Sequence, residues 1–253
     1  MVEINPEEKK RIILDIMIDI DDFCRAHNLP YVISSGTLLG AVRHGGFIPW
    51  DDDADMFMLR EDFDRFISLY KNRKYHLLYN ADSEEESFRL GFVKVCEPNT
   101  YMIRDNSKFR HGVYVDIFPL DYVPEDEKER NNYMGKLIRY QHGLRHRQKK
   151  DFLSVLTSYF HSVDWWWEKV DKTIRSSNYN DSRLVAHIVG SRNKKTVFDR
   201  NWLKNLKEID FEGRKFLTFA DTHSYLTMVY GDYMTPPPEN QRRGHAREKF
   251  YKK

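Results

Sequence analysis

A dense carboxylate cluster, Asp51-Asp52-Asp53-Ala54-Asp55, follows a glycine-containing turn in this chain of 253 residues. Residues two apart on a β-strand point to the same face, so Asp51, Asp53 and Asp55 would project together if a strand starts at the cluster. Mg²⁺ prefers oxygen ligands and usually binds one or two protein carboxylates together with phosphate oxygens of its substrate. The cluster therefore indicates a divalent cation and phosphate chemistry.

The turn before the cluster has the features of an anion site. Residues 38–43 are predicted to form a short helix that Gly45 and Gly46 close. Ser35, Gly36 and Thr37 then lie at its N-terminus, where free backbone N–H groups and the helix dipole favour an anion.

One more acid, Asp116, lies in a strand predicted over residues 113–118, on the face opposite the valines and isoleucine of that strand. A lone carboxylate in so apolar a strand is costly without a partner. A metal ion shared with Asp53 and Asp55 would supply one.

Phosphoryl transfer asks a protein mainly for positioning and charge neutralisation. Arg43, Lys94 and Arg242 are candidate cations for that task. For each of them, an ordinary surface salt bridge is the alternative interpretation.

The hydrophobic pattern predicts the elements that position these residues. Helices are expected over residues 6–27, 60–71 and much of 125–175, and strands over 31–34, 53–59, 88–96 and 113–118. Three prolines at 236–238 hold the chain extended, so the C-terminal tail should wrap over the core without adding a layer. We expect a single domain over residues 1–253, with the catalytic core in about 1–123 and a helical extension and tail in about 124–253.

Composition excludes several classes of protein. A hydrophobic content of 40% and an aromatic content of 14% favour a packed globular fold. The net charge of +2 is too small to indicate a nucleic-acid partner. Cys24 and Cys96, the two cysteines, support neither a disulfide framework nor a multi-thiolate zinc site, which fits a reducing compartment.

The sequence shows no signal peptide and no apolar stretch long enough for a transmembrane segment, so we expect a cytoplasmic protein. The basic run from Arg139 to Lys150 has two interpretations. It is a solvated helix face, or it meets phosphate-bearing acceptors or the inner face of the membrane as a peripheral contact.

Two other metal-binding functions compete for the acidic cluster. An EF-hand loop that starts at Asp51 would need glycine at its sixth position and glutamate at its twelfth, but Met56 and Asp62 stand there. The calcium interpretation therefore fails. A nucleotide-sugar glycosyltransferase, which also uses an acid-x-acid pair for its metal, remains an alternative.

The runs from Gly36 to Arg43 and from Gly46 to Asp55 resemble the signature of the LicD family of phosphocholine transferases, which includes the fukutin-like proteins. Later runs resemble that family in the same order: Val115-Asp116-Ile117-Phe118-Pro119-Leu120-Asp121, Phe211-Glu212-Gly213, and Tyr230-Gly231-Asp232-Tyr233-Met234 with Pro236, Pro237, Arg242 and His245. Ala54 and the pair Phe219-Ala220 depart from the family pattern, but none of them is a proposed ligand.

The resemblance implies an α/β (α+β) fold with a nucleotidyltransferase-like mixed sheet and additional helices. Asp53 and Asp55 match the paired metal acids and Asp116 the third, while Asp51 is an outer or alternative ligand. The implied cofactor is one or two Mg²⁺ ions, for which Mn²⁺ can substitute. Whether Asp116 accepts the proton of the attacking hydroxyl or serves only as a ligand stays open.

The resemblance also implies the reaction. CDP-choline would donate phosphocholine to a hydroxyl of a lipid-linked cell-surface glycan precursor, a teichoic acid or a lipopolysaccharide, with release of CMP. Transfer of ribitol or glycerol phosphate from a CDP-alcohol is the close alternative. A non-catalytic glycan- or nucleotide-binding module is the third hypothesis.

The substrate-binding set combines the glycine turn, the three cations and His245 of the tail. A choline head group favours an aromatic cage, for which Trp50, Tyr31 and Tyr233 are candidate rings.

Overall fold

In the computed structural model of the chain, residues 2–71, 73–79, 91–103, 111–148, 161–189, 196–242, 244 and 248–253 are described, without the side chains of 145–148. The α-helices are α1 (Pro6–Ala26), α2 (Ser35–His44), α3 (Arg60–Leu69), α4 (Glu127–Gln148), α6 (Val163–Arg175) and α7 (Thr222–Tyr230). Short 3-10 helices lie at Arg200–Leu203 and Glu239–Gln241. The strands are β1 (Val2–Glu3), β2 (Val32–Ile33), β3 (Asp55–Leu59), β4 (His76–Leu78), β5 (Val93–Cys96), β6 (Thr100–Ile103), β7 (Tyr114–Tyr122), β8 (Leu184–His187), β9 (Val197–Asp199), β10 (Lys207–Phe211), β11 (Arg214–Thr218) and β12 (Lys249–Lys252).

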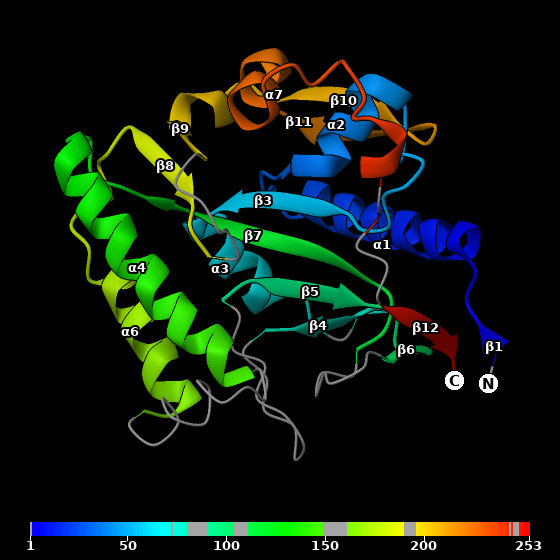
Figure 1. Cartoon of the computed structure of the whole chain (residues 1–253), viewed down its shortest axis with the longest axis horizontal. Helices are drawn as coiled ribbons and strands as arrows, with labels where there is room; N and C mark the ends of the chain where they lie inside the picture. Colours follow the sequence, from blue (N-terminus) through cyan, green and yellow to red (C-terminus); the bar gives the residue numbers. More distant parts are fainter. Residues whose placement is uncertain are drawn as a thin grey trace.

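A mixed sheet with the order β2-β3-β7-β5-β4 forms the centre of the molecule, and β8 and β9 extend it beside the last residues of β7 (Figure 1). β3 and β7 run parallel, whereas the other pairs described in this sheet are antiparallel. Helices α1 and α3 pack next to each other against β7, with the rings of Phe23 and Phe66 5.7 Å apart. The predicted α/β (α+β) class, a mixed sheet with additional helices, is confirmed.

Helix α1 shows how local chemistry produces a predicted element. Asn5 accepts a hydrogen bond from the backbone N–H of Glu8 at 2.9 Å, and Pro6 occupies the first turn. One face of the helix is buried, including Ile16 and Ile20. The prediction of a helix over residues 6–27 is confirmed to within one residue.

The strand after the acidic cluster begins later than predicted. β3 starts at Asp55, so Asp51 and Asp53 belong to the loop before it. The prediction that three acids project from one strand face is therefore wrong, because strand alternation applies to Asp55 alone. α2 begins earlier than predicted, at Ser35, and Gly45 caps its end as predicted, with a φ of 72° that suits glycine.

The C-terminal tail returns to the start of the chain. β12 pairs antiparallel with β1 on one side and with β6 on the other, and both termini lie at this end of the molecule (Figure 1). The last residues of the tail, Lys249–Lys252, thus form the middle strand of a three-stranded sheet, which the sequence did not predict.

The helical extension consists of α4 and α6, which pack together at the end of the sheet where β7 finishes (Figure 1). The basic run from Arg139 lies on α4, and its side chains from residue 145 onward are outside the described part. Trp165, Trp166 and Trp167 are each half-buried, and Trp167 packs against the core. None of the helices in the described ranges has the length and apolarity that a membrane span needs.

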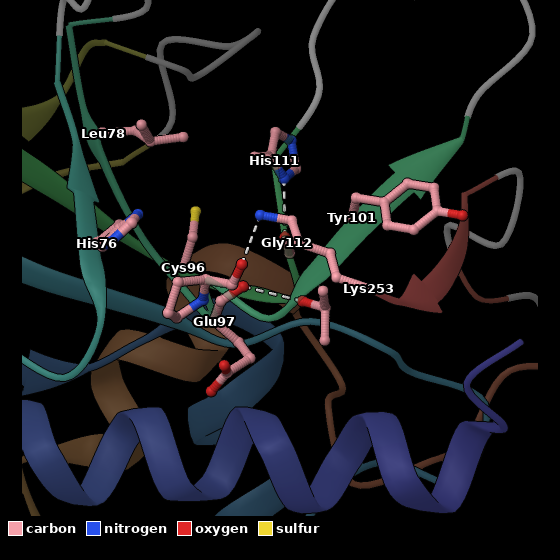
Figure 2. A pocket seen from close by; sticks show the side chains of 10 residues that line it. His76, Leu78, Cys96, Glu97, Tyr101, His111, Gly112 and Lys253 are labelled. Atoms are coloured by element: carbon pink, nitrogen blue, oxygen red, sulfur yellow. Dashed lines mark hydrogen bonds between the residues drawn. The ribbon is translucent and has the colours of Figure 1, made fainter. Parts of the chain in front are cut away.

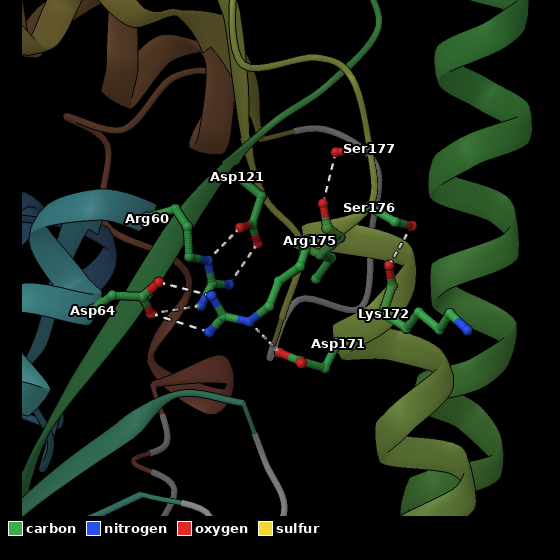
Figure 3. A network of polar contacts seen from close by, with 9 residues as sticks. Arg60, Asp64, Asp121, Asp171, Lys172, Arg175, Ser176 and Ser177 are labelled. Atoms are coloured by element: carbon green, nitrogen blue, oxygen red, sulfur yellow. Dashed lines mark hydrogen bonds and ion pairs between the residues drawn. The ribbon is translucent and has the colours of Figure 1, made fainter.

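Ion pairs fasten this extension to the sheet (Figure 3). Arg60 of α3 donates from Nε to Asp121 Oδ1 at 2.6 Å and from Nη2 to Asp121 Oδ2 at 2.9 Å. Arg175 of α6 contacts Asp64 of α3 at 2.9 and 3.2 Å and Asp171 at 2.9 Å. Asp121 is 1% exposed, so its charge depends on Arg60.

Replacing Arg60 by methionine should lower the free energy of unfolding by about 3–5 kcal/mol, because it leaves the buried carboxylate of Asp121 without its counter-charge. Arg175→Met breaks more exposed pairs of the same network and should cost about 1 kcal/mol. Urea unfolding followed by circular dichroism measures both values. Equal losses in the two variants would contradict this ranking.

Candidate active site

Three charged side chains form a row across three neighbouring strands. Asp55 of β3 pairs with Asp116 of the parallel strand β7, and Asp116 pairs with Lys94 of the antiparallel strand β5. Directly paired residues point to the same face of a sheet, so the three side chains are neighbours. The sequence prediction that Asp116 stands with Asp55 is consistent with this register.

Lys94 and Asp116 form a buried ion pair. Lys94 Nζ lies 2.7 Å from Asp116 Oδ1 and 2.9 Å from Oδ2, and it stands 3.4 Å from the centroid of the Tyr114 ring. Lys94 is 7% exposed and Asp116 is 8% exposed. Burial raises the pKa of Asp116 to about 6, and the Lys94 ammonium opposes this rise.

Asp55 has a less favourable environment. Burial raises its pKa well above the ordinary value, and the charges of Asp53, Asp116 and Asp51 raise it further. Lys94 acts in the opposite direction but is already bound to Asp116. The neighbouring carboxylates therefore disfavour the ionised form of Asp55.

The start of α2 meets the acidic loop. The Thr37 hydroxyl accepts a hydrogen bond from the backbone N–H of Asp55 at 2.8 Å, and the Ser35 N–H donates to the Tyr225 hydroxyl at 3.3 Å. A Cβ atom on Gly36 would come within 2.7 Å of Asp51 Oδ2. Glycine is thus needed for the approach of this carboxylate. Thr37 positions Asp55 through its hydroxyl, a role that its place in the turn did not predict.

Arg43, Trp50 and Arg242 come together from distant parts of the chain. The guanidinium carbons of Arg43 and Arg242 lie 6.0 and 5.2 Å from the Trp50 ring. Arg43 Nη1 donates to the Tyr233 carbonyl at 2.8 Å, and Arg242 Nε donates to the Pro237 carbonyl at 2.9 Å. Burial and then the nearby Arg242 charge lower the pKa of Arg43. Two like charges held together beside the acidic loop are suited to an anion.

Two predicted aromatic residues have other contacts. Tyr31 is 1% exposed and its hydroxyl donates to Asp21 Oδ1 at 2.5 Å, so the prediction of Tyr31 as a ligand ring is wrong. Its apolar strand neighbours carry it into the core. The Tyr233 hydroxyl lies 3.0 Å from His223 Nδ1. His245 lies outside the described residues.

Lys9 is a contributor that sequence reasoning missed. Its Nζ lies 2.9 Å from Asp52 Oδ2, and 12% of its side chain is exposed. The contact joins α1 to the acidic loop across 43 positions of sequence, a separation that no local pattern signals. The tail reaches the same loop, because a Cβ on Gly244 would lie 2.5 Å from the Trp50 carbonyl oxygen.

The residues present fit a hard divalent cation by their chemistry, since the cluster offers carboxylate oxygens and a cation would oppose the charges that raise the pKa of Asp55. Within the described ranges, no three acidic, histidine or cysteine side chains gather into a ready-made metal cluster. Lys94 contacts both carboxylate oxygens of Asp116 in this arrangement. Asp53 and Asp55 are therefore the better candidates for first contact with a cation.

A separate pocket of about 340 Å³ lies beside β4, β5 and β6 (Figure 2). It contains none of the predicted site residues that are described. Burial raises the pKa of Cys96 in its wall to about 12, which keeps the thiol protonated and unreactive. Burial, followed by the charge of Lys94, lowers the pKa of His111 to about 3. The Nδ1–H of His111 donates to the Gly112 carbonyl at 2.9 Å.

The buried His111 predicts a loss of stability in acid. The unfolded chain takes up a proton below about pH 6.5 that folded His111 refuses, so this contribution is complete above pH 6.5 and falls as the pH drops toward 3. At pH 5 the loss should be roughly 2 kcal/mol. Urea unfolding at pH 7.5 and 5.0 should show a smaller pH effect in His111→Gln than in the wild type. An unchanged pH effect in the variant would refute the prediction.

Comparison with known proteins agrees with the geometry. Residues 28–165 match the family described as LicD/FKTN/FKRP, nucleotidyltransferase domain. The chain is 27% identical, over 99% of both chains, to the lipopolysaccharide cholinephosphotransferase LicD of Haemophilus influenzae. It is 32% and 31% identical to uncharacterized proteins of Rickettsia typhi and Rickettsia prowazekii, over 48% and 47% of this chain and 38% and 42% of theirs. The expectation of a transferase-type enzyme is confirmed, and the chain belongs to the LicD/FKTN/FKRP nucleotidyltransferase-domain family.

Proposed function

We propose that this chain transfers phosphocholine from CDP-choline to a hydroxyl group of a cell-surface glycan and releases CMP. The observation that carries the proposal is the row of Asp55, Asp116 and Lys94 beside the glycine turn of α2. Likeness over 99% of the chain to a protein named lipopolysaccharide cholinephosphotransferase supports it. We therefore favour a lipopolysaccharide-type acceptor over a teichoic acid.

Asp53 and Asp55 would hold Mg²⁺, or Mn²⁺ in its place, with Asp116 as the third acid and Asp51 as an outer ligand. A bound cation would neutralise negative charge on the diphosphate of the donor. The carboxylates that raise the pKa of Asp55 support this assignment, because a cation would relieve their repulsion.

Protein side chains would supply further positive charge and would accept the proton of the attacking hydroxyl. Arg43 and Arg242 stand beside the acidic loop and would bind phosphate oxygens of the donor. Lys94 favours the ionised form of Asp116, which burial disfavours. An ionised Asp116 can accept the proton of the attacking hydroxyl.

The transfer balances without another reactant. A bond forms between the acceptor oxygen and the phosphorus atom that carries choline, and the bond from that phosphorus to the bridging oxygen breaks. CMP leaves with the electron pair of the broken bond. The hydroxyl proton goes to Asp116, or to water if Asp116 serves only as a ligand.

Choline recognition needs an aromatic ring that no protein cation already covers. Trp50 has two guanidinium groups over its ring, which suits phosphate better than choline. Tyr230, at the end of α7, is 41% exposed. Burial raises the pKa of the Tyr230 hydroxyl, and the charges of Tyr225 and of three carboxylates of the acidic cluster raise it further. We favour Tyr230 as a choline-binding ring.

A donor screen tests the function. With Mg²⁺ present, the purified protein should release CMP from CDP-choline faster than from CDP-ribitol or CDP-glycerol. Tyr230→Leu should raise KM for CDP-choline about tenfold, because loss of a cation–π contact costs about 1–2 kcal/mol, and should leave KM for CDP-glycerol within about twofold.

Other outcomes of the screen distinguish the alternatives. Faster turnover of CDP-ribitol or CDP-glycerol would show that the enzyme transfers the phosphate of that alcohol instead of phosphocholine. Turnover of UDP-sugars would favour a glycosyltransferase, and binding without turnover of any donor would favour a binding module.

The acids should divide their roles. Asp53→Asn and Asp55→Asn should each weaken cation binding and CMP release together, because each removes a charge that the cation needs. Asp116→Asn keeps the side-chain shape but loses basicity, so near-normal binding of Mg²⁺–CDP-choline with turnover reduced at least ~100-fold is expected of a general base. Calorimetry beside the CMP assay measures both. Parallel loss of binding and turnover in Asp116→Asn would show that Asp116 serves only as a ligand of the cation.

A further inference from the structure

A groove of about 600 Å³ lies between α4 and α6, away from the acidic cluster. Its charged lining residues are Lys136 of α4, Lys169 and Lys172 of α6, and Glu129 of α4. Glu129 accepts a hydrogen bond from the Tyr179 hydroxyl at 2.7 Å. Three ammonium groups therefore face one carboxylate that already has a partner.

The sequence spacing explains why these side chains share the groove. On α4, residues 129, 133, 136 and 140 lie three or four positions apart, and so fall on one helix face. On α6, residues 169, 172 and 173 are likewise three or four positions apart, and Ser176, which caps the helix, continues this face. The two faces oppose each other across the helix pair, with Tyr133 and Tyr140 as aromatic walls.

The two sides of α6 differ in charge balance. Toward α3, Arg175 binds Asp64 and Asp171 in the network of Figure 3. Lys172 points away from that network (Figure 3). Among the residues that the structure describes, the lysines of the groove have no carboxylate within ion-pair distance. The network side of the helix is neutralised, whereas the groove side keeps its positive charge.

We propose that this groove binds a phosphate-bearing sugar of the acceptor glycan, an assignment of the ligand that rests on the proposed function. Ammonium groups with the Thr173 hydroxyl suit a phosphate ester, and tyrosine rings offer a flat surface to a sugar. A recess of this size is suited to a single phosphosugar, whereas a membrane surface requires a flat or convex basic face.

The position of the groove excludes the nucleotide donor. The part of β7 from Asp116 to Tyr122 spans about 20 Å at about 3.3 Å per residue, and the α4–α6 pair packs beyond the last residue of the strand (Figure 1). Gln141 of α4 donates to the Ile188 carbonyl just after β8 at 3.0 Å, which holds the pair there. A glycan chain can extend from the acids to the groove, whereas one diphosphate cannot occupy both.

Lysine footprinting by mass spectrometry tests the groove without any need for turnover. The full-length protein is acetylated at low reagent concentration with glucose 6-phosphate, with glucose, or with vesicles of phosphatidylcholine and phosphatidylglycerol. Saturating glucose 6-phosphate should slow the acetylation of Lys136, Lys169 and Lys172 about fivefold or more, because a bound phosphate shields the amines. Lys215, an exposed lysine of β11, is the control and should not change.

The double variant Lys169→Glu/Lys172→Glu should abolish the protection of Lys136, while its circular dichroism and its CMP release without glycan stay as in the wild type. With a phosphorylated oligosaccharide acceptor, kcat/KM should fall about tenfold, and with the dephosphorylated acceptor it should not change. Lys215→Glu is the matched charge reversal and should alter none of these values.

Equal protection by glucose and glucose 6-phosphate, or no protection beyond that of Lys215, would overturn the proposal. Protection by the anionic vesicles alone would overturn it in favour of a membrane contact. If phosphate protects the groove but no donor releases CMP, the phosphate site stands and the proposed function fails.

Discussion

Two carboxylates, Asp55 and Asp116, are held at matched positions of adjacent parallel strands. Like charges side by side on a sheet repel each other, and burial adds to the cost. Lys94 offsets part of this cost by contacting both oxygens of Asp116. A divalent cation with its phosphate ligands would oppose the carboxylate charges that raise the pKa of Asp55.

The elements around the row of Asp55, Asp116 and Lys94 hold these charged side chains close together. α2 binds the start of β3 through Thr37, and the N–H of Ser34, just before α2, donates to the Asp55 carbonyl at 3.0 Å. α1 holds the acidic loop through Lys9, and the tail covers Trp50 from the other end of the chain. Segments from both termini thus stabilise the loop that carries Asp53, which explains why the site needs nearly the whole chain.

Sequence reasoning succeeded where a short pattern determines the structure. The cap at Asn5, the glycine that ends α2 and the opposite-facing acid at Asp116 all follow from local chemistry. Sequence reasoning failed where the exact start of a strand determines which side chains share a face. β3 starts at Asp55, so Asp51 and Asp53 are loop residues. The Lys9–Asp52 pair and the meeting of Arg43 with Arg242 depend on long-range packing, which has no local signal.

Electron paramagnetic resonance of Mn²⁺ can determine whether the carboxylates around Asp55 form a cation site, as we propose. Titrating wild-type protein and Asp55→Asn with Mn²⁺ measures the fraction of ion that leaves the free-ion signal. We expect saturable binding by the wild type and at least ~10-fold weaker binding by Asp55→Asn, whereas Asp15→Asn, at an exposed position of α1, should bind as the wild type does. Equal binding by wild type and Asp55→Asn would contradict the proposed cation site.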